Sequence, residues 1–517
     1  MTANSTDVVG QPGQRLTRYL NTVERVGNRL PHPFWLFGIL GVVVAGASTL
    51  LAAAGVSVTD PSSGDTVSVR NALSVDGIRE LVVGAQDSFV SFGPLGTVLI
   101  IMLGLGIANQ SGLLEATVHR ALARISPRWV VFAVCLTGAL SKFLEYSAYV
   151  VMIPLAAVAF QAVGRSPMLG MIVAFLSINA AGDANPFIAP GDVIFANIAT
   201  EAVQVVDPGG VVRATDNTYF TTVSALVLAV VLTIVTEKVL ARREHELIPD
   251  DDARGPGVRE EVPGLTPETE RRALRWTGIV AVGFIAVVVV AMVPAGSPLR
   301  GENGEILDSP LFNGIAAVLS LFFFAIGLTY AHLTHQVSSS ADLPEFMAEG
   351  LRSVTPLIVL FFAVSQFLAL FEWTEMSTVI AVHGADLLEQ LNAPIFVILL
   401  LLIVGIALLN LLITSGSALW ALVAPIIIPM MMLVGAQPAT VMAVYRIADS
   451  CTNSITPMSS TFILTVGFLQ TYRKKAGIGT LVSFTLPAAI AMLLAWTALF
   501  AIWYVTGLPL GPGSPVR

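Results

Sequence analysis

The chain has 517 residues, of which 55% are hydrophobic and 12% are charged, and its mean hydropathy is +0.79. Soluble domains carry about a quarter charged residues, so this composition excludes an ordinary soluble protein and indicates a polytopic membrane protein. The net charge of −8 is spread over loops, and we therefore expect no nucleic-acid partner. Residues 1–33 are polar and contain four arginines, which argues against a cleaved signal peptide.

Nine apolar stretches are long enough to cross a bilayer, and none alternates with the period of a barrel strand, so we predict helices. In chain order these stretches cover about 34–54, 93–112, 168–205, 219–240, 274–294, 311–335, 354–371, 437–470 and 479–508. The third and the eighth are too long for one straight helix and have polar, proline-containing middles. We predict that both are broken helices.

Two further apolar regions, 129–160 and 395–434, are interrupted at mid-length by SKFLEYSAY and NLLITSGSALW. The arm 395–409 spans roughly 22 Å as a helix, which is shorter than the roughly 30 Å hydrocarbon core. We therefore predict two re-entrant helical hairpins, each of which enters and leaves the membrane on one side. The predicted fold class is an all-α polytopic membrane protein with nine transmembrane helices and two hairpins.

The distribution of positive charge predicts the orientation. With a cytoplasmic N-terminus, 20 of the 27 Lys and Arg residues fall inside and 5 outside, as the positive-inside rule requires. The loops 55–80 and 295–310 are then ordinary external connections. The predicted organisation is a cytoplasmic segment 1–33, a first helix 34–54, a first repeat 93–240, a cytoplasmic linker 241–273, a connecting helix 274–294, a second repeat 311–508 and an external tail 509–517.

An internal repeat relates the two hairpin regions. The same offset of 271 residues separates Pro154 from Pro425, Gly164 from Gly435, Pro167 from Pro438, and Pro186 from Pro457. Five single crossings lie between the hairpins, and because this number is odd the two copies should be inverted. Interrupted apolar segments at matching positions of inverted repeats are typical of secondary transporters with a site near the bilayer midplane.

The stretch YRIADSCTNSITP, residues 445–457, places polar groups inside a predicted broken helix. Backbone groups freed at such a break must face protein, water or ions. We expect each hairpin tip to face the break of its own half. The second half would contribute Asn410, Thr414, Ser415, Ser417, Thr452, Asn453 and Thr456, and the first half Ser141 to Ser147, Asn179, Asp183, Asn185 and Asp192. Such oxygen-rich linings suit sodium, and Asp183 and Asp192 are candidates for sodium or a proton or for a solvated cavity wall.

Arg446, Asp449 and Asn453 follow at i, i+3 and i+7, so they share one helix face. An ionisable group within a span costs at least a few kcal/mol to insert and is therefore a functional candidate. Arg446 is suited to bind a substrate carboxylate in two-pronged fashion, and Trp420 is suited to cover an aromatic ring. The alternatives are a structural ion pair between Arg446 and Asp449, and ordinary core packing of Trp420.

Other residues of possible chemical interest have simpler interpretations. Lys142 and Glu145, three residues apart at the first hairpin tip, are expected to form an ion pair. The two cysteines, Cys135 and Cys451, fall within predicted spans and are expected to be packed thiols. The sequence has no GxxxxGK[ST] motif and no HExxH motif. GLGIANQSG, residues 104–112, is explained by close helix packing, and His332 and His335 by an exposed helix end.

Several segments resemble the p-aminobenzoyl-glutamate transporter (AbgT) family, in order and through nearly the whole chain. They are SAYVVMIPLAAVAFQAVGRSP, ANPF, YRIADSCTNSITP, KKAGIGTL and WYVTGLPLGPG. The resemblance implies a homodimer in the bacterial inner membrane, coupled to sodium or to the proton gradient. It also implies uptake of p-aminobenzoyl-glutamate, a folate breakdown product, or export of p-aminobenzoate and sulfonamide antimetabolites.

Matched by position, the family's important residues correspond to Asp192, Asn410, Ser417, Trp420, Pro438, Arg446 and Asp449. The chain departs from the family pattern at AAGDAN, PMSSTF and SKFLE, all within the expected lining. We expect a secondary active transporter of a small aromatic carboxylate that works by an elevator-like movement of the hairpin-bearing domain. An antimetabolite exporter is the alternative. A passive channel and a membrane enzyme are disfavoured, because pores usually form between subunits and no convincing nucleophile and base are present.

Overall fold

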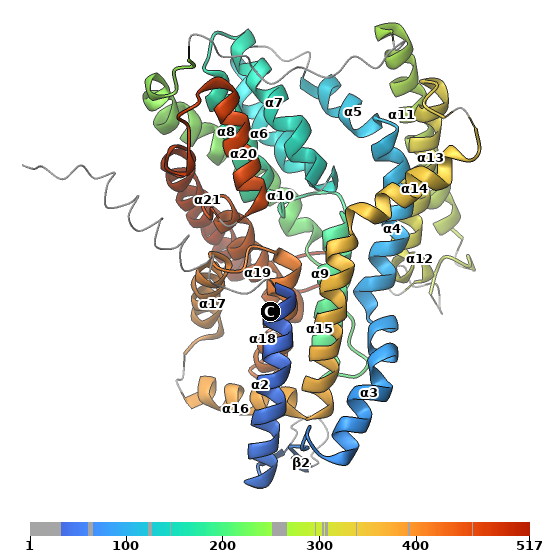
Figure 1. Cartoon of the computed structure of the whole chain (residues 1–517), viewed down its shortest axis with the longest axis vertical. Coiled ribbons are helices and arrows are strands. Elements are labelled where there is room, and N and C mark those ends of the chain that lie inside the picture. Colours follow the sequence, from blue (N-terminus) through green and yellow to red (C-terminus); the bar gives the residue numbers. More distant parts are fainter. Residues whose placement is uncertain are drawn as a thin grey trace, which may run out of the picture.

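The computed structural model describes residues 33–59, 66–122, 127–144, 146–250, 266–294, 296–301, 304, 309–337, 339–390, 393–457 and 459–517. The predicted cytoplasmic segment up to residue 32, Glu145, and positions 251–265 of the predicted linker lie outside the described residues. Within the described part, the chain is an assembly of helices with one small sheet (Figure 1).

The chain enters with α2 (Pro33–Ala53), followed by two antiparallel strands, β1 (Ser57–Thr59) and β2 (Thr66–Ser68). Next come α3 (Val75–Val90) and α4 (Gly93–Gln110). The segment 55–80, predicted as an ordinary external connection, contains the sheet and the start of α3, which were not predicted. The sequence of α3, VDGIRELVVGAQDSFV, contains four charged residues, so a search for apolar runs did not identify this helix.

The remaining helices follow in chain order. They are α5 (Leu113–Leu122), α6 (Val130–Leu140), α7 (Tyr146–Ala162), α8 (Pro167–Ala180), α9 (Pro190–Val203), α10 (Thr218–Val235), α11 (Pro267–Met292), α12 (Pro310–Asn313), α13 (Ile315–Leu333), α14 (Asp342–Ser353), α15 (Thr355–Trp373), α16 (Met376–Gln390), α17 (Ile395–Asn410), α18 (Gly416–Leu433), α19 (Pro438–Asn453), α20 (Ser460–Tyr472) and α21 (Ile478–Thr506).

Eight helical stretches of the described residues are long and apolar enough to cross a membrane, or nine if α16 and α17 count as one bent span. Seven of the eight coincide with predicted single crossings, and the eighth is α18, an arm of the second predicted hairpin. The multi-pass helical membrane fold is thereby confirmed. The amphipathic α14 and the horizontal α16 were not predicted, because neither forms a continuous apolar run of bilayer length.

Both predicted helix breaks are confirmed. α8 and α9 are separated by residues 181–189, and α19 and α20 by residues 454–459. Pro186 and Pro457 lie inside these gaps, where a proline removes a backbone donor and holds the preceding residue extended. The two breaks supply the free backbone groups and polar side chains that a continuous helix would hide.

Each of the two regions predicted as a hairpin forms a pair of packed helices. α6 packs against α7, and α17 packs against α18. The first pair lies in the upper part of the molecule beside α8 and α20, whereas α16, α17 and α18 lie in the lower part (Figure 1). This placement suits inverted copies. That each hairpin enters and leaves on one side of the membrane stays a prediction.

Helices α8 and α19 begin at positions that are 271 residues apart, the offset found in the sequence. Pro167 begins α8 and Pro438 begins α19, and each is preceded by a left-handed glycine, Gly164 with φ 75° and Gly435 with φ 91°. Only glycine adopts such a φ without strain. The thiol of Cys451 lies 3.8 Å from the carbonyl oxygen of Ala180, and these two residues are themselves 271 apart. Contact between equivalent residues is what a two-fold-like axis between the copies would produce.

The interpretation of GLGIANQSG as a close-packing segment is confirmed. α4 packs closely against α13 and α14. A Cβ added at Gly104 would lie 2.0 Å from the carbonyl oxygen of Ser320 in α13, and one at Gly350 in α14 would lie 2.4 Å from the carbonyl oxygen of Met102. Backbones that approach this closely exclude any side chain. Cys135 and Cys451 are buried, and His332 and His335 are exposed, as expected.

Candidate functional site

A cavity of about 580 Å³ lies between the hairpin tips and an opposing wall formed by α4, α14 and α15. This volume is typical of small-molecule sites. Its polar lining comprises Asn109, Gln110, Lys142, Tyr149, Asn179, Asp183, Glu349, Ser353, Thr414, Ser415, Ser417, Asp449, Asn453, Ser459, Ser460 and Thr461. Both predicted hairpin regions and both helix breaks therefore contribute to one chamber.

Asn410 fastens the second hairpin tip to the second helix break. Its side-chain nitrogen donates to the carbonyl oxygen of Asp449 at 2.7 Å, to Oγ1 of Thr452 at 2.8 Å and to Oδ1 of Asn453 at 3.1 Å. Thr456 adds a bond from its hydroxyl to the carbonyl oxygen of Leu411 at 3.0 Å. Asn410 is fully buried, so in this state it holds the site together from behind instead of lining it.

Replacing Asn410 with Ala should lower the free energy of unfolding by about 1–3 kcal/mol, because it leaves buried acceptors without their donor. Thermal unfolding of the purified protein in detergent measures this. Ser417→Ala at the same tip is the matched control, because it removes none of the hydrogen bonds seen between described residues. Equal unfolding midpoints for the two variants would contradict the fastening role.

Asp449 lines the cavity directly under the second hairpin tip. A Cβ added at Gly416 would lie 2.9 Å from its Oδ2, so the second hairpin tip lies directly against the carboxylate. Tyr445 donates its hydroxyl to the carbonyl oxygen of Gly416 at 2.5 Å and lies 3.5 Å from Oδ1 of Asp449. Gly416 also begins α18, and the partial positive charge of a helix N-terminus stabilises a carboxylate there.

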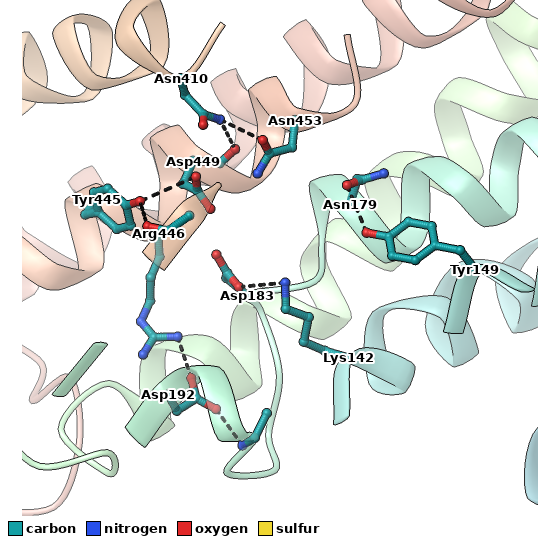
Figure 2. Close-up of polar contacts among 12 residues, drawn as sticks. Lys142, Tyr149, Asn179, Asp183, Asp192, Asn410, Tyr445, Arg446, Asp449 and Asn453 are labelled. Atoms are coloured by element: carbon teal, nitrogen blue, oxygen red, sulfur yellow. Dashed lines mark hydrogen bonds and ion pairs between the residues drawn. The ribbon is translucent and has the colours of Figure 1, made fainter. Parts of the chain in front are cut away.

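The first half presents a charged pair to the same chamber. Nζ of Lys142 lies 3.4 Å from Oδ1 of Asp183, and the hydroxyl of Tyr149 donates to Oδ1 of Asn179 at 2.9 Å (Figure 2). The expected partner of Lys142, Glu145, lies outside the described residues. Asp183 is only 6% exposed, so it is a nearly buried carboxylate at the wall of the chamber.

Arg446 points away from the chamber. Its Nη1 lies 2.5 Å from Oδ1 of Asp192, its side chain is 2% exposed, and its guanidinium lies 5.2 Å from the centre of the Phe195 ring. The other oxygen of Asp192 accepts the backbone N–H of Ala189 at 2.7 Å and so caps α9. The structural pair considered from sequence, Arg446 with Asp449, is therefore replaced by a pair that joins the two repeats.

The remaining predicted residues lie away from the main chamber. Asn185 lines a separate small pocket together with Arg446 and Asp192. Trp420 is fully buried, donates its indole N–H to the carbonyl oxygen of Phe195 at 2.9 Å, and lies 4.5 Å from the ring centre of Tyr445, which favours the core-packing alternative. Pro438 is the first residue of α19, where a missing N–H costs nothing.

Sequence reasoning missed the opposing wall. Asn109 and Gln110 end the apolar α4, and Glu349 and Ser353 lie on the amphipathic α14. A polar pair at the end of a span and a short amphipathic helix were the available signals. Neither signal indicates which face of the protein it will meet. The predicted roles of the thirteen site residues in binding or coupling stay predictions.

Comparison with known proteins adds family information. A model of the "AbgT putative transporter family" matches residues 18–517. The p-aminobenzoyl-glutamate transport protein of Escherichia coli (strain K12) is 36% identical over 499 residues, 95% of each chain. The Alcanivorax borkumensis YdaH transporter, whose crystal structure is described as having an unusual topology, superposes with a TM-score of 0.87 at 35% identity, over 93% of this chain and 100% of that one. Neisseria gonorrhoeae MtrF, described within a class of antimetabolite efflux pumps, gives 0.86 at 36% identity, over 96% and 100%.

Proposed function

The chain belongs to the AbgT transporter family, and on this premise we propose that it is an ion-coupled secondary active transporter of p-aminobenzoyl-glutamate or a related small aromatic carboxylate. The observation that supports this most directly is the single chamber lined by both hairpin tips and both helix breaks. Such a chamber, built from interrupted helices, is where transporters bind substrate and coupling ion together. The chamber is also large enough for an aromatic ring with an attached amino acid.

The chamber's position supports an elevator-like mechanism. One side consists of residues from the hairpins and broken helices, and the other side consists of α4, α14 and α15. α4 is joined to α13 and α14 by glycine-mediated backbone contacts, so these three helices form one packed block. A substrate held between a stationary block and the hairpin-bearing body would be moved across the bilayer when that body is displaced.

The proposal includes the coupling ion and the assembly. Three carboxylates, Asp183, Glu349 and Asp449, line the chamber among amide and hydroxyl oxygens, a lining that suits a sodium ion or a proton. We place the protein in the bacterial inner membrane as a homodimer, with its N-terminus in the cytoplasm. The similarity to MtrF favours a second function through the same chamber, export of p-aminobenzoate and sulfonamides.

Uptake into proteoliposomes tests the proposal. Labelled p-aminobenzoyl-glutamate and a labelled sulfonamide are offered separately under an imposed sodium gradient and an imposed proton gradient. We expect accumulation of the carboxylate under one gradient, and acceleration by substrate on the opposite side, as a carrier requires. Accumulation of the sulfonamide alone would favour the export function. Flux that never responds to substrate on the opposite side would indicate a channel, and a chemically altered product would indicate an enzyme.

Asp449→Asn is expected to reduce the transport rate about 10- to 100-fold. The substitution removes the negative charge that lies against the second hairpin tip and that would attract a bound cation or amine. Initial rates in proteoliposomes with equal protein content measure the loss. Asp386→Asn is the matched control, since Asp386 is 60% exposed in α16 and away from the chamber. An undiminished rate in the Asp449 variant would remove this carboxylate from the mechanism.

A further inference from the structure

We propose that Lys142 is the cation that recognises the substrate's carboxylate, and that Asp183 is the partner which Lys142 leaves in order to do so. This inference rests on the proposed function and adds the charged group that selects carboxylate ligands. The sequence had suggested Arg446 for this role, but the two basic side chains are held very differently in the structure.

Arg446 is enclosed away from the chamber, whereas Lys142 borders it. The Arg446 guanidinium is 2.5 Å from Asp192, covered by Phe195 and 2% exposed, and it does not line the chamber. The Lys142 side chain is 30% exposed, lines the chamber, and lies 3.4 Å from its partner oxygen. Charge-assisted hydrogen bonds are usually about 2.7–2.9 Å long, so the Lys142–Asp183 pair is loose. Figure 2 shows the Lys142 ammonium pointing toward the space between Asp183 and Asp449.

Lys142 can leave Asp183 only if another cation takes its place. Its Oδ1 faces Lys142, whereas its Oδ2 is buried and has no hydrogen-bond partner among the described residues. A buried carboxylate that loses its counter-charge is strongly unfavourable. When Lys142 turns to a substrate carboxylate, Asp183 must therefore receive a proton or a sodium ion. Substrate binding and cation binding then favour each other, and this mutual dependence is what coupling requires.

Asp449 sets the orientation of the ligand. A substrate carboxylate would be repelled by Asp449, so it belongs at the first hairpin tip beside Lys142. The aromatic amine at the other end of the ligand is a hydrogen-bond donor, and Asp449 and Oδ1 of Asn453 are acceptors on the opposite side of the chamber. The chamber thus offers a cation, Lys142, to the acid end of the ligand and hydrogen-bond acceptors to its amine end.

Two matched probes test the inference on the purified full-length protein. p-Aminobenzoate and p-aminobenzamide share a ring and an amine, but only the first has a carboxylate. In Lys142→Gln we expect the Kd of p-aminobenzoate to rise about 10- to 100-fold, while the Kd of p-aminobenzamide changes less than about twofold. Lys142→Arg keeps the charge and should retain most of the preference for the acid. Equal affinities of wild type and Lys142→Gln for p-aminobenzoate would overturn the inference.

The double variant Lys142→Gln with Asp183→Asn separates recognition from a structural role. It removes both charges of the Lys142–Asp183 pair, so neither is left without the other. If the pair is only structural, the double variant should regain both thermal stability and p-aminobenzoate affinity, which would overturn the inference. We expect it to regain stability but to remain weak for p-aminobenzoate.

Asp183→Asn alone tests the exchange. It leaves Lys142 without this competing carboxylate, so p-aminobenzoate should bind at least as tightly as in the wild type. Gradient-driven accumulation in proteoliposomes should be lost while exchange of substrate continues. Accumulation that persists would remove Asp183 from the coupling.

Binding measurements on the wild-type protein separate a failure of the proposed function from a failure of the Lys142 assignment. A wild-type protein that binds neither probe nor p-aminobenzoyl-glutamate would refute the proposed function together with this inference. A wild-type protein that prefers the acid, alongside a Lys142→Gln variant with the same preference, would refute the assignment of Lys142 only.

Discussion

Arg446→Met alone should destabilise the folded protein by about 3–5 kcal/mol, because it leaves the Asp192 carboxylate buried without its counter-charge. The geometry supports a value in this range. The two side chains are 2.5 Å apart and are 2% and 15% exposed, so water cannot take over the role of the missing guanidinium. The unfolding midpoint of the detergent-purified variant is the measurement.

Arg446→Met combined with Asp192→Asn should recover most of that stability, because the pair is then removed as a whole and no lone charge remains. The control is Arg70→Met, which breaks an ion pair with Glu375 in which Arg70 is 56% exposed, and which should cost no more than about 1 kcal/mol. A double variant as unstable as the single one would contradict this account. The double variant is also the proper test of transport, since the single variant would lose activity through unfolding alone.

Gly104→Val should prevent the protein from folding in useful yield. A Cβ at this position would lie 2.0 Å from the carbonyl oxygen of Ser320, and neither atom can rotate away, because the Cβ is fixed by the backbone of α4 and the oxygen belongs to the backbone of α13. Separating α4 from α13 would disturb the packed block that also includes α14 and forms part of the opposing wall. The yield of monodisperse protein from detergent-solubilised membranes measures the effect.

Gly96→Val is the matched control for this substitution. Gly96 lies two turns earlier on the same helix, and nothing approaches within 4 Å of the position of an added Cβ. Both variants pay the same helix-propensity and β-branching costs, so the difference between them isolates the close contact. Similar yields for the two variants would mean that α4 and α13 can move apart without penalty.

The features predictable from sequence were those encoded by short-range chemistry. Polar, proline-containing interruptions of long apolar runs identified the two helix breaks, because backbone geometry depends on the residue itself and its neighbours. Apolar runs of bilayer length identified the single crossings. Helices that lack such a run, α3, α14 and α16, escaped prediction, although α14 contributes Glu349 and Ser353 to the chamber.

The partners of the charged groups were not predictable. Helical spacing correctly placed Arg446 near Asp449 on α19, but it gave no information about a carboxylate 254 residues away, and the two side chains diverge toward different pockets. Lys142 likewise lies beside Asp183, which comes from a different segment of the chain, and no local sequence pattern predicts this contact. Local periodicity determines which face a side chain occupies, and tertiary packing determines which neighbour it meets there.

The contact between Ala180 and Cys451 has a consequence for how the protein can move. Ala180 ends α8, and Cys451 lies near the end of α19. The two broken helices therefore touch next to their breaks, where the regular backbone hydrogen bonding of each helix stops. Neither break can be bent independently without pressing on the other. The hairpins and broken helices of the two repeats are therefore expected to shift together during a transport cycle, with the bending in their connections to α4, α14 and α15 and not at the breaks themselves.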